Sequence, residues 1–408
     1  MREATPAAYA ALAGWGLICA TGKTAATLHA ALQANRSALA VAPRFSAPLF
    51  QTNIVGAAPR EESDDPAWEL AATALQEAVG GVARLLRTIP AARLGLVLST
   101  TKANIEALER ISAGRPCSAS ARHHLRAEAL AADLAAEFGA RGPVQNISNA
   151  CVSGLVALVQ GAKLIQRGTA DAVLVVGVDH LSAFVVSGFS TLKAIDPRGC
   201  RPFDRHRCGL SPGEAGAAIV LLRPDLAPAG TVRISGWGAS NDANHMTGPA
   251  RDGAGLAQAI RLALTRAQLA PAQVDYINAH GTGTAYNDAM ESAALRSIFG
   301  TEVPAMGGLK GMFGHTLGAA GVLETIACAM ALQDQFLPGT PRLEQAETGF
   351  PSRLMKQPRP APGLKHVLKL NTGFGGMNGA LLLEQTGKVA PAASLPEATR
   401  CGRPASAF

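Results

Sequence analysis

Residues 145–154 read Gln-Asn-Ile-Ser-Asn-Ala-Cys-Val-Ser-Gly, a short β-prone approach that ends in small polar residues and a cysteine. The segment that follows, 154–165, is apolar nearly all round, as is typical of a helix that runs through the middle of a domain. Cys151 is therefore expected at the N-terminus of a buried helix, where the helix dipole favours a thiolate and the Cys151 and Ser153 amides are candidate oxyanion donors. The alternative, a structural cysteine in an Ala- and Gly-rich core, is the better explanation for an isolated cysteine.

Length and composition restrict the class of protein. A chain of 408 residues with 48% hydrophobic and 16% charged residues predicts two domains or one duplicated domain. The net charge of +7 comes without a basic cluster interleaved with aromatics, so nucleic acid is not an expected partner. Seven cysteines without a CxxC pair predict neither disulfides nor a zinc site, and they fit a reducing cytoplasm.

No membrane association is expected from the sequence. The apolar stretch 9–20 lacks a convincing positively charged segment before it, so we interpret it as a first strand and turn and not as a signal peptide. No run reaches the roughly 18 uninterrupted apolar residues that a membrane helix needs.

Apolar runs of strand length alternate with helical patterns along the chain. Strands are expected at 94–99, 171–178 and 217–222, and helices at 67–86 and 127–138. Strands that are apolar on both faces and alternate with helices indicate a mostly parallel sheet covered on both sides, which is an α/β fold.

The second half of the chain repeats this pattern. A helix is expected at 255–267, strands at 232–237, 274–278, 367–371 and 380–384, and a second central helix rich in Ala and Gly at 318–332. One such helix per half predicts a duplication with two packed halves, residues 1–230 and 231–385. The proline-containing segment 386–408 is expected to be a disordered tail.

Two histidines follow features that place them at a site. His280 lies in the loop 278–284, Asn-Ala-His-Gly-Thr-Gly-Thr, directly after a strand, where open α/β sheets place their ligands. His315 opens the second small-residue helix, and Lys310 precedes it by five residues. Glu324, further along that helix, could balance the lysine. The glycine-rich turn 373–379 lacks a GxGxxG order and a following helix, so it is interpreted as a flexible loop that brings an amide close to a reacting atom.

Together these motifs resemble the β-ketoacyl-acyl carrier protein synthases, the elongating condensing enzymes of the thiolase superfamily. The resemblance covers about residues 10–385. It rests on residues 149–154, 201–204, 213–216, 242–247, 278–284, 310–321 and 373–378. It implies a thiolase-like, five-layered αβαβα fold made of two duplicated halves.

The resemblance also implies a reaction, a decarboxylative Claisen condensation with malonyl-acyl carrier protein. By position, Cys151 matches the acylated nucleophile. His280 and His315 match the pair that assists decarboxylation and stabilises the enolate. No metal or organic cofactor is implied, because the substrates are carried on the 4'-phosphopantetheine of the carrier protein.

Five further residues match supporting positions of the family. Lys310 matches the lysine that organises the site, and Glu324 matches its acidic partner. Thr282 and Thr284 match the threonines that bind the phosphopantetheine arm. Phe374 matches a gating phenylalanine whose amide joins that of Cys151 in the oxyanion hole.

The resemblance implies an acyltransferase of KAS I/II-like type, although the sequence departs from the usual family pattern in three places. Asn149 stands where Thr is usual, and residues 213–216 read Gly-Glu-Ala-Gly. Residues 100–102, Thr-Thr-Lys, replace a glycine-rich segment that borders the acyl pocket, and they faintly resemble synthases of aryl polyenes. Fatty-acid, aryl-polyene and polyketide biosynthesis therefore all stay open.

Two other functions are compatible with this fold, that of a non-catalytic partner and that of a thiolase. A non-catalytic partner of the same fold, like a chain-length factor, would lack the nucleophile, whereas Cys151, His280, His315 and Lys310 are all present. A degradative thiolase would prefer Cys-His-Cys chemistry and coenzyme A.

The expected partners are an acyl carrier protein and a second subunit. The subunit would be another copy, a related ketosynthase or a chain-length factor. Because carrier proteins are acidic, a +7 chain should attract them electrostatically. The candidate docking residues are Arg115, Arg122, Arg201 and Arg205.

Overall fold

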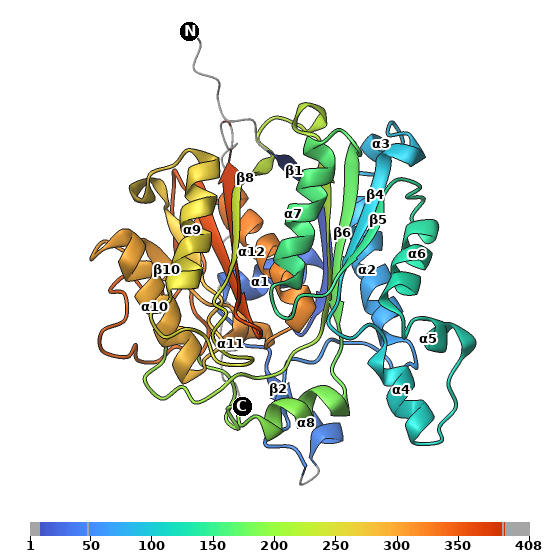
Figure 1. Cartoon of the computed structure of the whole chain (residues 1–408), viewed down its shortest axis with the longest axis horizontal. Coiled ribbons are helices and arrows are strands. Elements are labelled where there is room, and N and C mark those ends of the chain that lie inside the picture. Colours follow the sequence, from blue (N-terminus) through green and yellow to red (C-terminus); the bar gives the residue numbers. More distant parts are fainter. Residues whose placement is uncertain (1–8, 47–48, 386, 388–408) are drawn as a thin grey trace, which may run out of the picture.

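The computed structural model describes residues 9–46, 49–385 and 387. Ten strands form one sheet in the order β10-β9-β13-β14-β8-β1-β7-β6-β4-β5 (Figure 1). These strands are β1 Ala10–Cys19, β4 Leu94–Ser99, β5 Val144–Ile147, β6 Ala172–Asp179, β7 Ala215–Leu222, β8 Val232–Asn241, β9 Tyr276–Asn278, β10 Ala305–Gly307, β13 His366–Gly373 and β14 Met377–Gln385. Two-residue strands make two small separate pairs, β2 Ala40–Val41 with β3 Ile54–Val55, and β11 Phe336–Leu337 with β12 Arg359–Pro360.

Each half of the sheet has the same pairing pattern. In one half β5, β4 and β6 are parallel and continue antiparallel into β7 and β1. In the other half β10, β9 and β13 are parallel and continue antiparallel into β14 and β8. The halves join between β1 and β8 through only two residue pairs, Ala10 with Ile234 and Ala11 with Arg233. The expected mostly parallel sheet needs one correction: β7 in one half and β14 in the other run opposite to the other four strands of their half.

Two central helices, α7 and α12, lie between the two halves of the sheet. The helices are α1 Ala25–Gln33, α2 Pro66–Gly80, α3 Ala83–Leu86, α4 Ile105–Ser112, α5 Ala119–His123, α6 Ala127–Glu137, α7 Ser153–Gln166, α8 Ala183–Thr191, α9 Ala254–Ala267, α10 Ala285–Phe299, α11 Lys310–Phe313 and α12 Ala320–Asp334. Helices α2 and α6 pack on the outer face of one half, and α9 and α10 cover the other. The result is the five-layered αβαβα arrangement that the resemblance implied.

Glycines allow α7 and α12 to touch. A Cβ atom on Gly321 would lie 2.2 Å from the backbone nitrogen of Leu155, and one on Gly154 would lie 2.9 Å from the Gly318 carbonyl oxygen. Any larger residue at either position would push the helices apart. This close approach brings the N-terminal ends of the two central helices together, and both ends carry candidate site residues.

Some local expectations need correction. The helix expected at 67–86 is two helices, α2 and α3, because the first ends at Gly80. The second central helix begins at Ala320, after a 3-10 turn over Leu317–Ala319. Apart from residue 387, the tail 386–408 lies outside the described residues, and the division at 230/231 stays a prediction.

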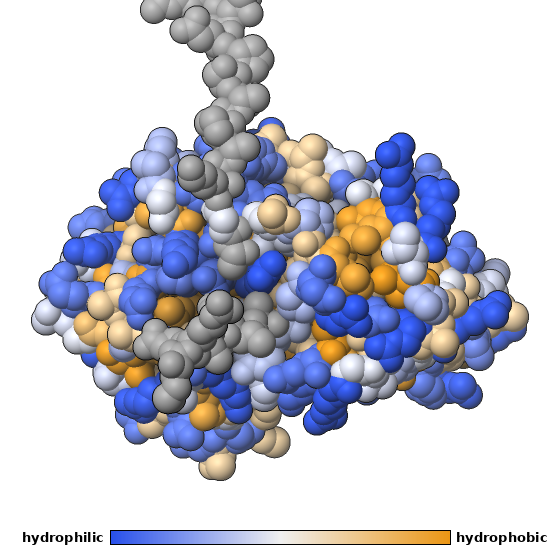
Figure 2. Space-filling model, turned by 90° about the horizontal axis from the view of Figure 1, so that it is seen from above, coloured by the Kyte–Doolittle hydropathy of each residue, from blue (hydrophilic) through white to orange (hydrophobic). Residues whose placement is uncertain are grey.

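The surface carries its apolar residues in separate areas. Figure 2 shows the face at the top of Figure 1, where hydrophilic residues cover most of the surface between apolar areas. Within the described part of the chain, every helix is too short or too polar to cross a bilayer.

Candidate active site

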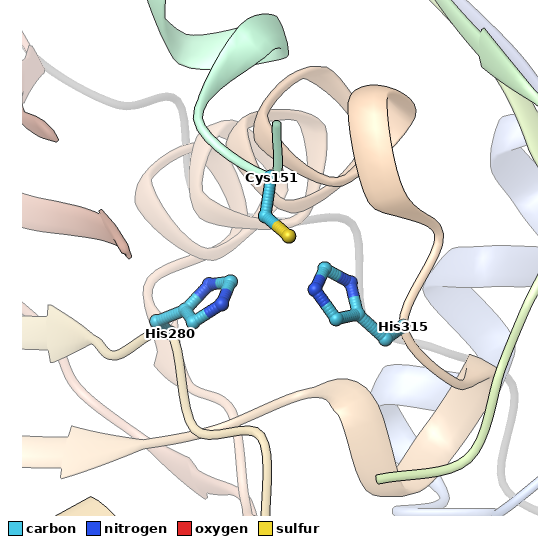
Figure 3. A group of neighbouring side chains, drawn as sticks. All are labelled: Cys151, His280 and His315. Atoms are coloured by element: carbon cyan, nitrogen blue, oxygen red, sulfur yellow. The ribbon is translucent and has the colours of Figure 1, made fainter. Parts of the chain in front are cut away.

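Cys151 lies on a strained turn between β5 and α7. Ala150 has a φ of 46°, a left-handed conformation that non-glycine residues adopt rarely and that clusters at functional sites. The buried Ser153 hydroxyl holds this turn, because its oxygen accepts from the Asn149 N–H at 2.7 Å and donates to the Ala150 carbonyl at 2.6 Å. The turn aims Cys151, which is 8% exposed, toward the space below α7 (Figure 3).

Two imidazoles face the Cys151 sulfur. His280 follows β9 on a loop, and His315 lies between α11 and the turn that precedes α12. One ligand atom from each of the three side chains lies within 4.8 Å of the other two. The rings approach the sulfur from either side, with centroids 5.2 Å apart (Figure 3). The structure therefore assembles the predicted cysteine and both predicted histidines.

Hydrogen bonds fix the tautomer of both rings. His280 Nδ1 lies 3.1 Å from Lys310 Nζ and 3.2 Å from Asn371 Nδ2, and an ammonium has only donors to offer. His315 Nδ1 accepts the Leu317 N–H at 3.2 Å. Each Nδ1 is thus an acceptor, so each neutral ring carries its proton on Nε2. Two N–H donors are then available to an oxygen of a substrate.

Burial keeps both rings neutral. The pKa of His280 is well below its ordinary value because of burial and then the charge of Lys310, and the same two causes lower the pKa of His315. Both rings therefore serve as neutral donors at neutral pH.

Lys310 is held by Glu324, as predicted. Lys310 Nζ lies 2.7 Å from Glu324 Oε1 and also donates to the His280 carbonyl at 2.6 Å. A second lysine, Lys369 on β13, lies 2.6 Å from the other oxygen, Glu324 Oε2. Neither Lys369 nor Asn371 was predicted.

Family models match this chain along most of its length. Residues 45–227 match the beta-ketoacyl synthase N-terminal domain, and residues 231–344 match the beta-ketoacyl synthase C-terminal domain. The chain belongs to the beta-ketoacyl synthase family. The tetracenomycin polyketide synthase ketoacyl synthase alpha subunit of Streptomyces glaucescens is 32% identical over 410 residues, which cover 91% of this chain and 96% of that protein.

Two solved ketosynthase complexes share the fold. One is the ketosynthase ApeO in complex with its chain length factor ApeC from Xenorhabdus doucetiae, with 27% identity, a TM-score of 0.83 and coverage of 95% of this chain and 100% of that chain. The other is a type II PKS acyl-carrier protein in complex with its ketosynthase, with 25% identity, a TM-score of 0.85 and coverage of 94% and 100%. These likenesses confirm the thiolase-like fold.

The aligned segment is shorter for some relatives. A putative polyketide beta-ketoacyl synthase 1 of Streptomyces cyaneus is 38% identical over 267 residues, which cover 62% of this chain and 63% of that protein. The chain therefore spans less than two thirds of that relative.

Cys151, the predicted nucleophile, is a protonated thiol at rest. Burial is the main cause that raises the pKa of Cys151, to about 11, while the charge of Lys310 and a hydrogen bond from the Phe374 amide oppose it. The expectation of a favoured thiolate is wrong. Helix α7 begins two residues later, at Ser153, and the water-poor surroundings of the sulfur outweigh the nearby positive charge.

We expect alkylation of Cys151 by iodoacetamide to keep accelerating up to about pH 11, because only the thiolate reacts. The rate should rise about tenfold per pH unit below the pKa. Peptide mapping of samples quenched at each pH measures the alkylation rate of Cys151, and the exposed Cys208 serves as an internal comparison. A plateau of the Cys151 rate near pH 8 would contradict a raised pKa.

Buried carboxylates hold the His280 loop. Glu291 accepts the backbone N–H groups of His280 and Gly281, each at 2.7 Å. Burial, and then the charge of Asp288, raises the pKa of Glu291 to about 7. Asp288 accepts the Phe203 and Gly283 amides at 2.8 and 3.2 Å. Neither acid was predicted, although both lie on α10 directly after the histidine loop.

A third buried acid, Asp179, supports the His315 side. It accepts the Gly318 N–H at 2.7 Å and the Thr101 hydroxyl at 2.8 Å, and Lys102 Nζ lies 3.1 Å away. The unusual Thr-Thr-Lys segment is thereby attached to the turn that follows His315.

A cavity of about 430 Å³ leads from the surface to Cys151, His280 and His315. Thr282 and Thr284 line it, with hydroxyl oxygens 2.9 Å apart. Phe374 also lines it and packs at a tilt on Phe189, with ring centroids 5.9 Å apart. Phe374 directs its amide to the Cys151 sulfur.

The four arginines named as docking candidates differ in exposure. Arg201 is paired with Asp196 at 3.1 Å, and only 12% of its side chain is exposed, so it is a poor docking residue. Arg115, Arg122 and Arg205 are exposed.

Proposed function

We propose that this protein is a ketosynthase that condenses a Cys151-bound acyl group with malonyl-acyl carrier protein and releases CO₂. The observation that carries the proposal is the convergence of one thiol and two neutral imidazoles, each with its free N–H on Nε2, within 4.8 Å. A thiol accepts the acyl group, and paired N–H donors stabilise an enolate.

The first half-reaction is acyl transfer. The Cys151 sulfur attacks the thioester carbonyl of the acyl carrier, the bond from carbonyl carbon to carrier sulfur breaks, and the thiol proton ends on the departing carrier sulfur. The Cys151 amide is the proposed oxyanion donor. The Phe374 amide, which bonds the resting sulfur, would move to the carbonyl oxygen as the second donor.

The second half-reaction makes a carbon–carbon bond. The malonyl thioester oxygen accepts the N–H groups of His280 and His315, the bond to the carboxylate breaks, and CO₂ departs. The resulting enolate attacks the acyl carbon on Cys151, whose sulfur leaves and takes up a proton. Burial of both histidines keeps water away from the enolate.

We propose that the reaction needs no metal. The same three atoms are close enough to hold an ion, but the Lys310 ammonium already lies against His280, and a second cation there would be repelled. The carrier's phosphopantetheine arm would occupy the cavity beside Thr282 and Thr284.

The site argues against the two alternatives. A chain-length-factor-like role needs no assembled nucleophile, yet Cys151 and both imidazoles are assembled. A thiolase would place a second cysteine at the reacting atoms, whereas the three groups brought together here are one cysteine and two histidines.

We propose a second subunit at β5. This strand ends the sheet with a free edge among the described residues, and Val144 on it is 41% exposed. Free edges pair readily with another strand. The subunit would be a chain of the same fold, as in the ApeO complex. Native mass spectrometry of the protein, alone and with co-expressed ketosynthase-like chains, would show a homodimer or a heterodimer, and a monomer in both samples would contradict this assignment.

The pathway belongs to the same proposal. The similarity to a polyketide synthase ketoacyl synthase alpha subunit favours polyketide synthesis over a KAS I/II-like role in fatty-acid synthesis, and aryl-polyene synthesis remains the alternative that residues 100–102 suggest. A cytoplasmic location fits the described cysteines, which are all free thiols.

We expect a Cys151→Gln variant to decarboxylate malonyl-carrier protein without forming any condensed product. The glutamine amide imitates the acylated thiol, and the two imidazoles that bind the enolate are unchanged. Trapping of released CO₂, together with mass spectrometry of the carrier, measures both outcomes. Absence of CO₂ release above that of a Cys151→Gln/His280→Ala/His315→Ala control would count against the proposed function.

A further inference from the structure

One face of β13 is polar although the strand is buried. Side chains alternate along a strand, so Lys369, Asn371 and Gly373 share one face. Gly373 lies against the Cys151 amide, Asn371 donates to His280, and Lys369 pairs with Glu324. Each of the three therefore contacts a residue of the site or of its support, and Gly373 is the one of the three that lines the cavity.

Lys369 makes a buried triad with Lys310 and Glu324. All three side chains have no exposed surface. Glu324 gives one oxygen to each lysine, at 2.7 and 2.6 Å, and Lys369 also donates to the Leu370 carbonyl. Both ammonium groups are therefore bound through the same carboxylate.

The charge of this triad is the reason to assign it a role. One lysine would neutralise Glu324, and a buried, neutral ion pair would be enough to hold Lys310. A second ammonium leaves one net positive charge in a water-poor region, which is costly unless an anion uses it. The decarboxylation step of the proposed function brings such anions, the malonyl carboxylate and then the enolate, to this place.

We infer that Lys369 is a positioning residue for decarboxylation. It shares Glu324 with Lys310 and so gives the triad one net positive charge. That charge disfavours a second positive charge on His280 or His315 and favours the anionic enolate. The inference rests on the proposed function. Burial and a nearby Lys369 charge both act to lower the pKa of each histidine.

Several other charged or titratable groups face the triad. Those that interact with it or with the two imidazoles are Cys151, Lys102, Cys200, Glu291 and Cys328. Of these, Cys328 lies on α12 next to Lys369, and its pKa is raised to about 12 by burial, so it stays neutral over the working pH range. Asp179 is already bonded to Lys102, which leaves the triad as the charge closest to His280.

The test is the pH profile of malonyl decarboxylation by Cys151→Gln protein with and without Lys369→Met. Protonation of His280 at Nδ1 would place an N–H against the Lys310 ammonium and disrupt this contact. Activity should therefore fall at low pH, which is the acid limb of the profile. Removal of Lys369 takes the triad from one positive charge to zero, which raises the histidine pKa values. We expect the acid limb to move up by about one pH unit and kcat to fall about tenfold, with KM changed less than about threefold.

Two control variants separate charge from packing. Lys365→Met removes an exposed positive charge just before the same strand and should leave the profile unchanged. Lys369→Met/Glu324→Gln restores one net positive charge, through Lys310 alone, so the acid limb should return to the position seen in the Cys151→Gln parent, although kcat stays low. A purely structural role for Lys369 predicts no such return.

An unshifted acid limb in folded Lys369→Met protein would overturn the inference, as would a double variant whose limb stays shifted. If Lys369→Met does not fold, Lys369→Gln, which keeps a polar side chain without the charge, replaces it, and the same shift of the acid limb is expected. Titration of either imidazole near the ordinary value of about 6.5 in the unsubstituted protein, followed by imidazole ¹⁵N NMR, would also contradict the inference. Loss of decarboxylation in the Cys151→Gln parent would instead count against the proposed function.

Discussion

Replacement of Cys151 by alanine is expected to abolish both acyl loading and condensation, to below about 10⁻⁴ of the unsubstituted rate. The thiol is the atom that holds the acyl group between the two half-reactions in the proposed mechanism. Cys208, a second thiol that lines the cavity, is not among the three groups that converge there. Intact-mass spectrometry after incubation with acyl-carrier protein measures the loading, and carrier mass measures the product.

The fold should survive this change. Alanine is compatible with the turn, since Ser153 and not the thiol makes its hydrogen bonds. The free energy of unfolding should change by no more than about 1 kcal/mol. Ser153→Ala is a useful contrast, because it leaves the thiol in place but removes the support of the strained Ala150. Condensation by Cys151→Ala at near the unsubstituted rate would mean that the nucleophile is assigned wrongly.

Loss of either histidine is expected to separate decarboxylation from loading. His280→Ala and His315→Ala should each slow CO₂ release by about 10²–10³-fold, because each removes one donor to the enolate oxygen. Acyl transfer to Cys151 should persist, since the groups that lower the thiol pKa are Lys310, the Phe374 amide and Lys102, and neither imidazole is among them.

Matched variants sharpen the separation. His280→Gln and His315→Gln keep an N–H donor at about the reach of the imidazole Nε2 and should lose less activity than the alanine variants. Loading by mass and CO₂ release are measured on the same samples. The reverse pattern, with loading lost and decarboxylation kept, would show that the histidines serve the thiol and not the enolate.

The sequence predicted the parts of this site that stand next to a distinctive local pattern. Cys151 precedes an apolar helix, His280 follows a strand, and His315 precedes a small-residue helix, so each was placed correctly next to its element. The pairing of Lys310 with Glu324 was predicted from their separation near one helix, and the structure confirms it.

The parts that the sequence did not predict depend on distant contacts. The segment of β13 around Lys369 and Asn371 was interpreted only as a strand, and a lysine in a strand normally faces water. Its role is visible only once both faces of β13 are seen to be covered. Asp179, Glu291 and the raised pKa of Cys151 likewise depend on burial by segments far away in the chain. The antiparallel orientation of β7 and β14 was not predicted, because the residues of an apolar run do not indicate the direction in which the strand will run in the sheet.

The most direct test of the central claim is the mass of the carrier protein after one turnover with acyl-loaded enzyme and malonyl-carrier protein labelled with ¹³C in the free carboxylate. Decarboxylative condensation predicts a carrier-bound 3-oxoacyl group two carbons longer than the acyl group loaded on Cys151, with all of the label released as ¹³CO₂ in equal amount. Label retained on the carrier, or ¹³CO₂ released without any lengthened acyl group, would contradict the account.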